Sequence, residues 1–142
     1  MGSTDHRGRP RGETSRQWWR GCGSRASIDG LGGAPGAGAY SAAKHGVIGL
    51  SKTPALEYAA SGIRVNAVCA GAFRTPMLER ATKRSGLEPE AAEARYRGMI
   101  PLGRIGEPDE AARAIVWLAS DDASYVTGHA LVVAGGTRAA WR

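Results

Sequence analysis

Three side chains in the first third of the sequence, Ser27, Tyr40 and Lys44, could together move a proton to or from a substrate oxygen. Tyr40 and Lys44 are four residues apart at the start of a helical segment, a spacing that places both on one face of the helix. A cation beside a phenol favours the phenolate, which makes the pair a candidate general acid–base unit. Ser27 lies 13 residues before Tyr40, where its hydroxyl could bind the same oxygen. An isolated Tyr-x-x-x-Lys pair is also typical of an ordinary surface helix, so the surrounding elements decide.

The elements that must position these side chains are a series of helices and strands. Apolar residues recur with a helical period over residues 39–61, which predicts a helix that ends at Gly62. Pro54 lies inside this segment and predicts a kink or a local break. Two runs are typical of buried strands, at residues 63–69 and 130–134. Three more segments are helical, at residues 77–83, 90–97 and 107–119. This order predicts an α/β fold with a parallel sheet.

The segment before the first helix, residues 21–38, is rich in glycine and predicts a loop, with no strand leading to Ser27. Its glycine spacing is similar to that of a phosphate-binding turn. Such a turn needs a strand before it and an acidic residue about 20 positions further on. We therefore interpret residues 30–38 as a connection between Ser27 and Tyr40.

The motifs of this chain, taken in order, resemble the C-terminal half of a classical short-chain dehydrogenase/reductase. The resemblance runs from about residue 26 to residue 137. Its main motifs are Ala26-Ser27, Tyr40-Ser41-Ala42-Ala43-Lys44, Gly62-Ile63-Arg64-Val65-Asn66-Ala67-Val68, Thr75-Pro76-Met77, Pro101-Leu102-Gly103-Arg104, Gly106-Glu107-Pro108 and Tyr125-Val126-Thr127-Gly128.

The resemblance implies a doubly wound parallel sheet of the Rossmann type. It also implies an NAD(P)-dependent oxidoreductase that transfers a hydride between its cofactor and an alcohol or a ketone. Tyr40 would be the acid in ketone reduction and the base in alcohol oxidation, and Ser27 would orient the substrate oxygen. Lys44 would hold the ribose hydroxyls beside the nicotinamide and favour the phenolate of Tyr40. In the intact family, the resemblance further implies a homo-oligomer.

The loop after the first predicted strand would complete the cofactor side of the site. Gly71, Phe73 and Thr75 would hold the nicotinamide carboxamide through backbone groups and the threonine hydroxyl. Tyr40 and Lys44 would also bind the cofactor. Residues 76–105 would form the substrate lid. The sequence selects neither NAD nor NADP, because the residue that makes this choice in the family has no counterpart here.

The first half of the family pattern has no match in this sequence. Residues 1–25 cannot hold the family's glycine-rich turn, its cofactor-selecting residue and its catalytic asparagine. We expect them to form a basic, disordered leader unrelated to the family, followed by a partial Rossmann-type domain at residues 26–142. On this hypothesis the chain is truncated, lacks the N-terminal cofactor half and is inactive alone. Two smaller departures are Ala70, where the family usually has Pro, and Ala134, where it usually has Asp.

Composition and charge limit the other function classes. The chain has 142 residues and a formal net charge of +6, and residues 1–20 hold five Arg against two acidic residues. The longest strongly apolar run, residues 114–119, is too short to span a membrane, and the N-terminus lacks the apolar run of a secretory signal. Cys22 and Cys69 form neither a disulfide framework nor a zinc site, so we expect a cytoplasmic protein without a metal.

Two alternatives to an enzyme stay open at this point. The stretch from Arg7 to Pro10 resembles an AT-hook, whose arginines bind the minor groove of A·T-rich DNA. A short motif in a leader rich in arginine and glycine also arises by chance, so we do not expect a nucleic-acid partner. The second alternative is a non-enzymatic fragment that pairs with a full-length family member through the 107–119 helix and the last strand.

Overall fold

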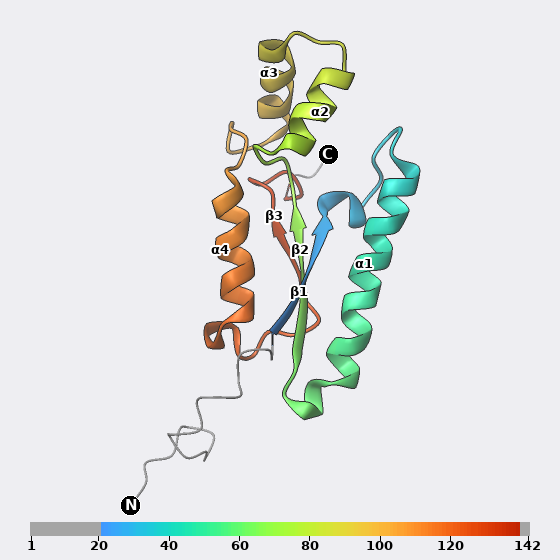
Figure 1. Cartoon of the computed structure of the whole chain (residues 1–142), viewed down its shortest axis with the longest axis vertical. Coiled ribbons are helices and arrows are strands. Elements are labelled where there is room, and N and C mark those ends of the chain that lie inside the picture. Colours follow the sequence, from blue (N-terminus) through green and yellow to red (C-terminus); the bar gives the residue numbers. More distant parts are fainter. Residues whose placement is uncertain (1–20, 140–142) are drawn as a thin grey trace, which may run out of the picture.

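The computed structural model describes residues 21–139, and three parallel strands form its sheet (Figure 1). The strands are β1 at Gly21–Ser27, β2 at Arg64–Ala70 and β3 at Ala130–Val133, and they lie in the order β1-β2-β3. Both neighbouring pairs are parallel. The expected α/β fold with a parallel sheet is therefore confirmed.

The helices cover both faces of this sheet and one of its ends. Helix α1, Gly38–Glu57, packs on one face and α4, Pro108–Ala119, on the other (Figure 1). Helices α2, Pro76–Arg84, and α3, Pro89–Met99, lie beyond the carboxyl ends of the strands. All three expected short helices form, and each begins at a proline, whose fixed φ suits the first helical position.

The core lies between the sheet and α1. Ala26 of β1 and Ala67 and Cys69 of β2 are buried against Ile48 of α1. Strand β2 is the middle strand, and its five central residues are all buried. A strand covered on both faces is a short, continuous run of mostly apolar and β-branched residues, and such a run located β2 to within one residue.

Two polar side chains of β2 join the sheet to the end of α4. The Arg64 guanidinium donates to the backbone carbonyls of Leu118, at 2.7 Å, and Ser120, at 2.9 Å. These carbonyls lie at the end of α4, where helical carbonyls lack partners within the helix. The carboxamide of Asn66, which is fully buried, accepts from the backbone N–H of His129 at 3.0 Å. The Arg-Val-Asn motif is thus a structural connection between β2 and the chain that leads to β3.

The loop predicted for residues 21–25 is wrong, because these residues form the first part of β1. The strand pairs with β2 along its whole length, from Gly21 opposite Arg64 to Ser27 opposite Ala70. Strand pairing is made by backbone groups. The hydrogen bonds to the edge of β2 therefore outweigh the weak strand propensity of Gly and Arg. The leader expected at residues 1–25 therefore gives way to the sheet at Gly21. Residues 1–20, with the Arg7–Pro10 motif, lie outside the described residues.

The break predicted at Pro54 is absent, and α1 runs through it to Glu57. Pro54 lies in the last turn of α1, where few backbone bonds follow it. A single 3-10 turn, Ala59–Ser61, follows, and the chain leaves it at Gly62 with φ of +75°. Helix α1 therefore ends four residues before the predicted end, and Gly62 ends the 3-10 turn instead, since only glycine adopts this conformation at little cost.

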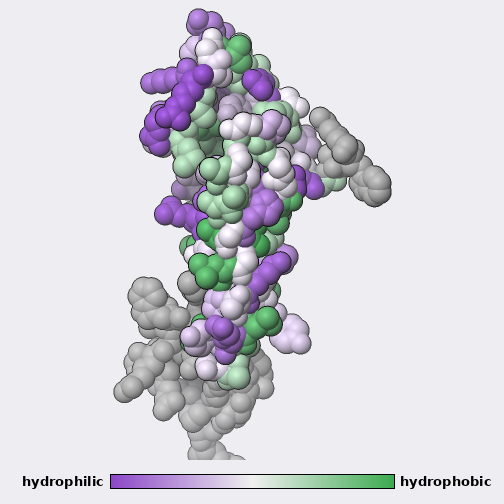
Figure 2. Space-filling model, turned by 90° about the vertical axis from the view of Figure 1, so that its right-hand side faces the viewer, coloured by the Kyte–Doolittle hydropathy of each residue, from purple (hydrophilic) through white to green (hydrophobic). Residues whose placement is uncertain are grey.

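The α1 side of the molecule is shown in Figure 2. Apolar patches alternate with hydrophilic residues along its length, and hydrophilic side chains are prominent at the end that carries α2 and α3. Leu50 and Leu56 of α1 are 71% and 83% exposed. Within residues 21–139, no helix combines the length and the apolar character that crossing a membrane requires.

Candidate active site

The carboxyl ends of the three strands meet at one edge of the sheet, and the predicted site residues lie along it. Ser27 is the last residue of β1, and its register partner on β2 is Ala70, immediately before Gly71. The Gly71 N–H in turn bonds to the carbonyl of Val133 at the end of β3, at 2.9 Å. The structure therefore brings Ser27 and the start of the predicted cofactor loop side by side. Ligands of open parallel sheets bind at this edge.

Tyr40 and Lys44 lie in the first two turns of α1, on the same face of the helix, as their spacing predicts. The Lys44 ammonium is 5.4 Å from the centre of the Tyr40 ring, a cation–π distance. Its Nζ also donates to the carbonyl of Arg25 on β1, at 3.1 Å. Lys44 is thus held between helix and sheet through one of its three N–H groups. Tyr40 is 39% exposed, and its hydroxyl has no hydrogen-bond partner within residues 21–139.

Ser27 is buried, at 7% exposed, and its hydroxyl is only partly used. The Oγ accepts from the backbone N–H of Asp29 at 3.2 Å, which begins a 3-10 turn at Ile28–Gly30. At Gly30 this turn packs on α1 so closely that a Cβ would lie 2.7 Å from the carbonyl oxygen of Lys44. The glycine lets the chain after Ser27 contact the helix that carries the acid–base pair. The three predicted catalytic residues therefore lie on elements in direct contact.

The loop predicted to hold the nicotinamide, residues 71–75, is fixed at both ends. A Cβ on Gly71 would lie 2.7 Å from the Cβ of Ala134, so glycine is required beside β3. At the other end, the Thr75 hydroxyl caps α2 by accepting from Leu78 N–H at 3.4 Å. The same hydroxyl donates to the Phe73 carbonyl at 3.3 Å. The hydroxyl expected to contact a cofactor thus bonds within its own loop in this structure.

Arg74, in the middle of this loop, is a residue that the sequence did not single out. Its guanidinium forms ion pairs with Glu93 of α3, at 2.8 Å, and with Glu107 before α4, at 3.1 Å. Arg97, one turn after Glu93 on α3, pairs with the same carboxylate. The hydrogen bonds from Arg74 and Arg97 lower the pKa of Glu93 to about 2. Only the Glu93–Arg97 pair has a spacing that a sequence can reveal.

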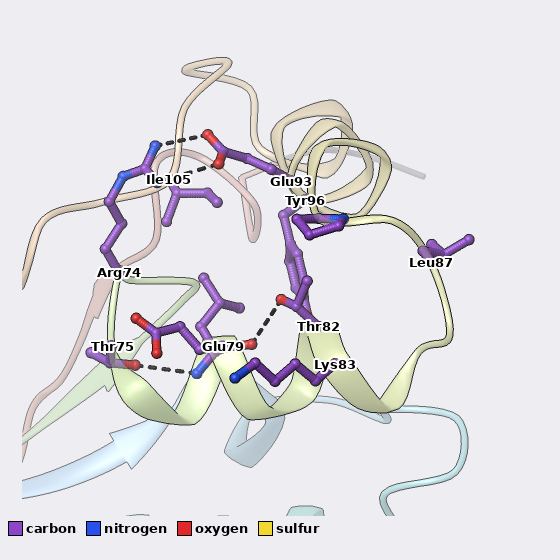
Figure 3. Close-up of a pocket in the computed structure, with 11 residues that line it drawn as sticks. Arg74, Thr75, Glu79, Thr82, Lys83, Leu87, Glu93, Tyr96 and Ile105 are labelled. Carbon is purple, nitrogen blue, oxygen red and sulfur yellow. Dashed lines mark hydrogen bonds and ion pairs between the residues drawn. The ribbon is translucent and has the colours of Figure 1, made fainter.

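A cavity of about 300 Å³ lies between α2 and α3 (Figure 3). The wall combines apolar side chains, among them Leu78 and Ile105, with the ring of Tyr96 and the Arg74–Glu93 pair. Its size is at the lower end of small-molecule sites. Helices α2 and α3 fall within residues 76–105, the segment expected to be the substrate lid, and they stand over the edge of the sheet where the strands end (Figure 1).

The residues present fit the nicotinamide end of a dinucleotide, whereas the described residues lack the fingerprint for its phosphates. Tyr40 and Lys44 lie at the start of α1, and the Lys44 ammonium bonds to Arg25 of β1, two residues before Ser27. The glycines before α1 follow strand β1, so the expectation that no strand precedes them is wrong. The other requirement is still unmet, because Glu57, at about that spacing, lies within α1, and β2 ends in Ala70.

Comparison with known proteins places the chain among oxidoreductases. The family model described as enoyl-(acyl carrier protein) reductase matches residues 24–138. The chain is 50% identical over 113 residues to 2,5-dichloro-2,5-cyclohexadiene-1,4-diol dehydrogenase of Sphingobium indicum, which covers 78% of this chain and 43% of that protein. It is 46% identical over 110 residues to cyclohexanol dehydrogenase of an Acinetobacter strain, covering 78% of this chain and 40% of that protein.

Solved structures agree. Aldohexose dehydrogenase of Thermoplasma acidophilum matches with a TM-score of 0.80 and 36% identity, over 85% of this chain and 49% of its own. The NADP-bound structure of ElxO matches with a TM-score of 0.75 and 32% identity, over 84% and 47%. The sheet is thus part of a Rossmann-type dehydrogenase fold. The chain belongs to the short-chain dehydrogenase/reductase family. It spans less than half the length of these relatives, as the resemblance to one half of a family member predicts.

Proposed function

We propose that this chain carries the proton-transfer side of a nicotinamide-dependent oxidoreductase site that acts on an alcohol or a ketone. One observation carries the proposal: the Lys44 ammonium lies over the Tyr40 ring while it is bonded to β1, the strand that ends in Ser27. The printed names of two relatives, a diol dehydrogenase and a cyclohexanol dehydrogenase, support the alcohol class.

In this proposal Tyr40 is the general acid and base. Its exposed hydroxyl donates a proton to the carbonyl oxygen of a ketone during reduction, and the phenolate takes a proton from an alcohol during oxidation. The Ser27 hydroxyl donates a hydrogen bond to the same oxygen and stabilises the charge that develops there. The Lys44 ammonium, held by the Arg25 carbonyl, favours the phenolate of Tyr40.

NAD or NADP, when bound, supplies or accepts the hydride. Lys44 and Tyr40 would hold its ribose, and residues 71–75, with Gly71, Phe73 and Thr75, would hold its carboxamide. The register that places Ser27 beside Ala70 supports this assignment, because it sets the loop next to the substrate-orienting hydroxyl. Helices α2 and α3 would cover the substrate, which their place over the sheet edge supports. We propose that the chain by itself is inactive.

A graft tests this function. Residues 24–138 replace the matching segment of the Acinetobacter cyclohexanol dehydrogenase, and hydride transfer is followed by the absorbance of the reduced nicotinamide. Tyr40→Phe in the graft should lower kcat by roughly 10²–10⁴-fold, the usual contribution of general acid–base catalysis. Tyr58→Phe is the matched control, because this half-exposed tyrosine follows the other end of α1. An active graft that is unaffected by Tyr40→Phe would refute the proposal.

A further inference from the structure

We infer that Arg74 is a positioning residue that joins the 71–75 loop to helix α3 and to the start of α4, so that loop and lid move together. The meaning of this link for catalysis rests on the proposed function, in which the loop holds the nicotinamide and the lid covers the substrate. The link itself is a property of the fold.

The contacts of Arg74 reach three separate parts of the chain. Its backbone N–H bonds to the Gly106 carbonyl at 2.9 Å. The two terminal nitrogens of its guanidinium donate to the two carboxylate oxygens of Glu93 on α3, at 2.8 and 3.4 Å. Its Nε is 3.1 Å from the Glu107 carboxylate, at the N-cap of α4. Paired N–H···O contacts of this kind fix direction as well as distance, so α3 cannot shift against the loop without breaking them.

Few buried side chains hold helices α2 and α3 themselves in place. Helix α2 buries no residue, and α3 buries only Ala92. Behind α3, Ile100 and Ile105 are buried, and the Leu102 N–H bonds to the Gly135 carbonyl at 3.1 Å. These contacts anchor the chain that follows α3. The body of α3 meets the loop through Arg74, and Figure 3 shows this side chain reaching along the wall of the cavity to Glu93.

The neighbouring arginine has a different role. Arg97 pairs with Glu93 from within α3, so this pair crosses no boundary between elements. It stiffens one turn of the helix. Of Arg74, Glu93 and Arg97, only Arg74 belongs to the 71–75 loop. It therefore transmits a movement of α3 to the backbone of that loop. A substrate that displaces α3 would therefore shift the proposed nicotinamide loop.

Amide hydrogen exchange of the full chain tests the link, read by mass spectrometry in peptides that cover residues 72–75 and 89–99. Arg74→Met should speed exchange in both segments by roughly two- to tenfold, as expected for exposed but paired ion contacts. Glu93→Gln should also speed exchange in both segments. The double variant Arg74→Met/Glu93→Gln should add little to Arg74→Met, because the two substitutions remove the same Arg74–Glu93 interaction. Arg74→Lys, which keeps a charge but loses the paired geometry, should restore part of the protection.

Two controls separate this role from a general loss of stability. Arg97→Met should leave residues 72–75 unchanged, and Arg104→Met, which breaks the comparable Arg104–Glu110 pair, should leave α3 unchanged. Exchange in β1 and α1 should match the parent chain in every variant. The inference is overturned if Arg74→Met leaves both segments unchanged, or if Arg97→Met affects the loop equally. Failure of the proposed function would appear in the Tyr40 graft and leave this exchange pattern intact.

Discussion

Tyr40, Lys44 and Ser27 differ in how far the sequence alone could place them. The four-residue spacing fixed the first two on one helix face, because helix geometry is local. Ser27 needed more, since its place beside Ala70 depends on a strand that residue types did not suggest. The pair formed by Lys44 and the Arg25 carbonyl spans 19 residues and depends on the packing of α1 against the sheet. Long-range contacts of this kind carry no sequence period.

The ion pairs of Glu93 predict how stability depends on pH. Its pKa in the folded chain is about 2, against an ordinary value of 4.5, because Arg74 and Arg97 hydrogen-bond the charged form. A lowered folded pKa means that the stabilisation is complete above about pH 4.5 and is lost as the pH falls through about 2. In urea unfolding, the midpoint of the parent chain should exceed that of Glu93→Gln by a constant gap above pH 5. The gap should shrink between pH 4.5 and 2, and a gap unchanged down to pH 2 would contradict the assignment.

The packing of the chain before α1 against this helix explains one of the glycines in residues 30–38. Gly30 is needed because a Cβ would lie 2.7 Å from the Lys44 carbonyl oxygen and 2.9 Å from a carbon of Ile48. Gly33 lies three residues further on, and a Cβ there would meet no atom within 4 Å. One glycine in this segment therefore brings two elements together, whereas the other leaves room for a side chain.

The two glycines make a matched pair for a stability measurement. Gly30→Ala should lower the free energy of unfolding by about 1–3 kcal/mol, because the extra methyl group forces the turn away from α1. Gly33→Ala should change it little or raise it by up to about 1 kcal/mol, through a less mobile unfolded chain. Urea unfolding followed by far-UV circular dichroism measures both. Equal effects of the two substitutions would show that the close approach at Gly30 is not what requires glycine.

Strand β1 is the element that the sequence did not predict. The helices follow from periodicity and from prolines at helix starts, and strands β2 and β3 follow from short apolar runs; each of these signals acts within a few residues. Strand β1 has little strand propensity, and it forms because its backbone pairs with β2 along seven register positions. Helix α1 continues through Pro54 because the proline falls in its last turn. Both misses come from tertiary or positional context that overrides a local preference.

In the whole molecule, the chain would present one side of the proposed site. The sheet edge carries Ser27, the Tyr40–Lys44 pair and the 71–75 loop, and the family relatives are about twice as long as this chain. The expected homo-oligomer and the expected cytoplasmic location stay predictions. We propose that these residues hold the nicotinamide and transfer the proton, while residues outside them bind the phosphates of the cofactor.

Calorimetric titration with NADH and NADPH tests that claim most directly. The 142-residue chain should give no saturable heat up to about 1 mM cofactor, because without phosphate contacts the remaining groups supply less than the ~4 kcal/mol that a millimolar dissociation constant represents. The graft of residues 24–138 into the cyclohexanol dehydrogenase should bind one equivalent, and Lys44→Met should weaken that binding. Saturable one-to-one binding of either cofactor by the 142-residue chain alone would contradict the account.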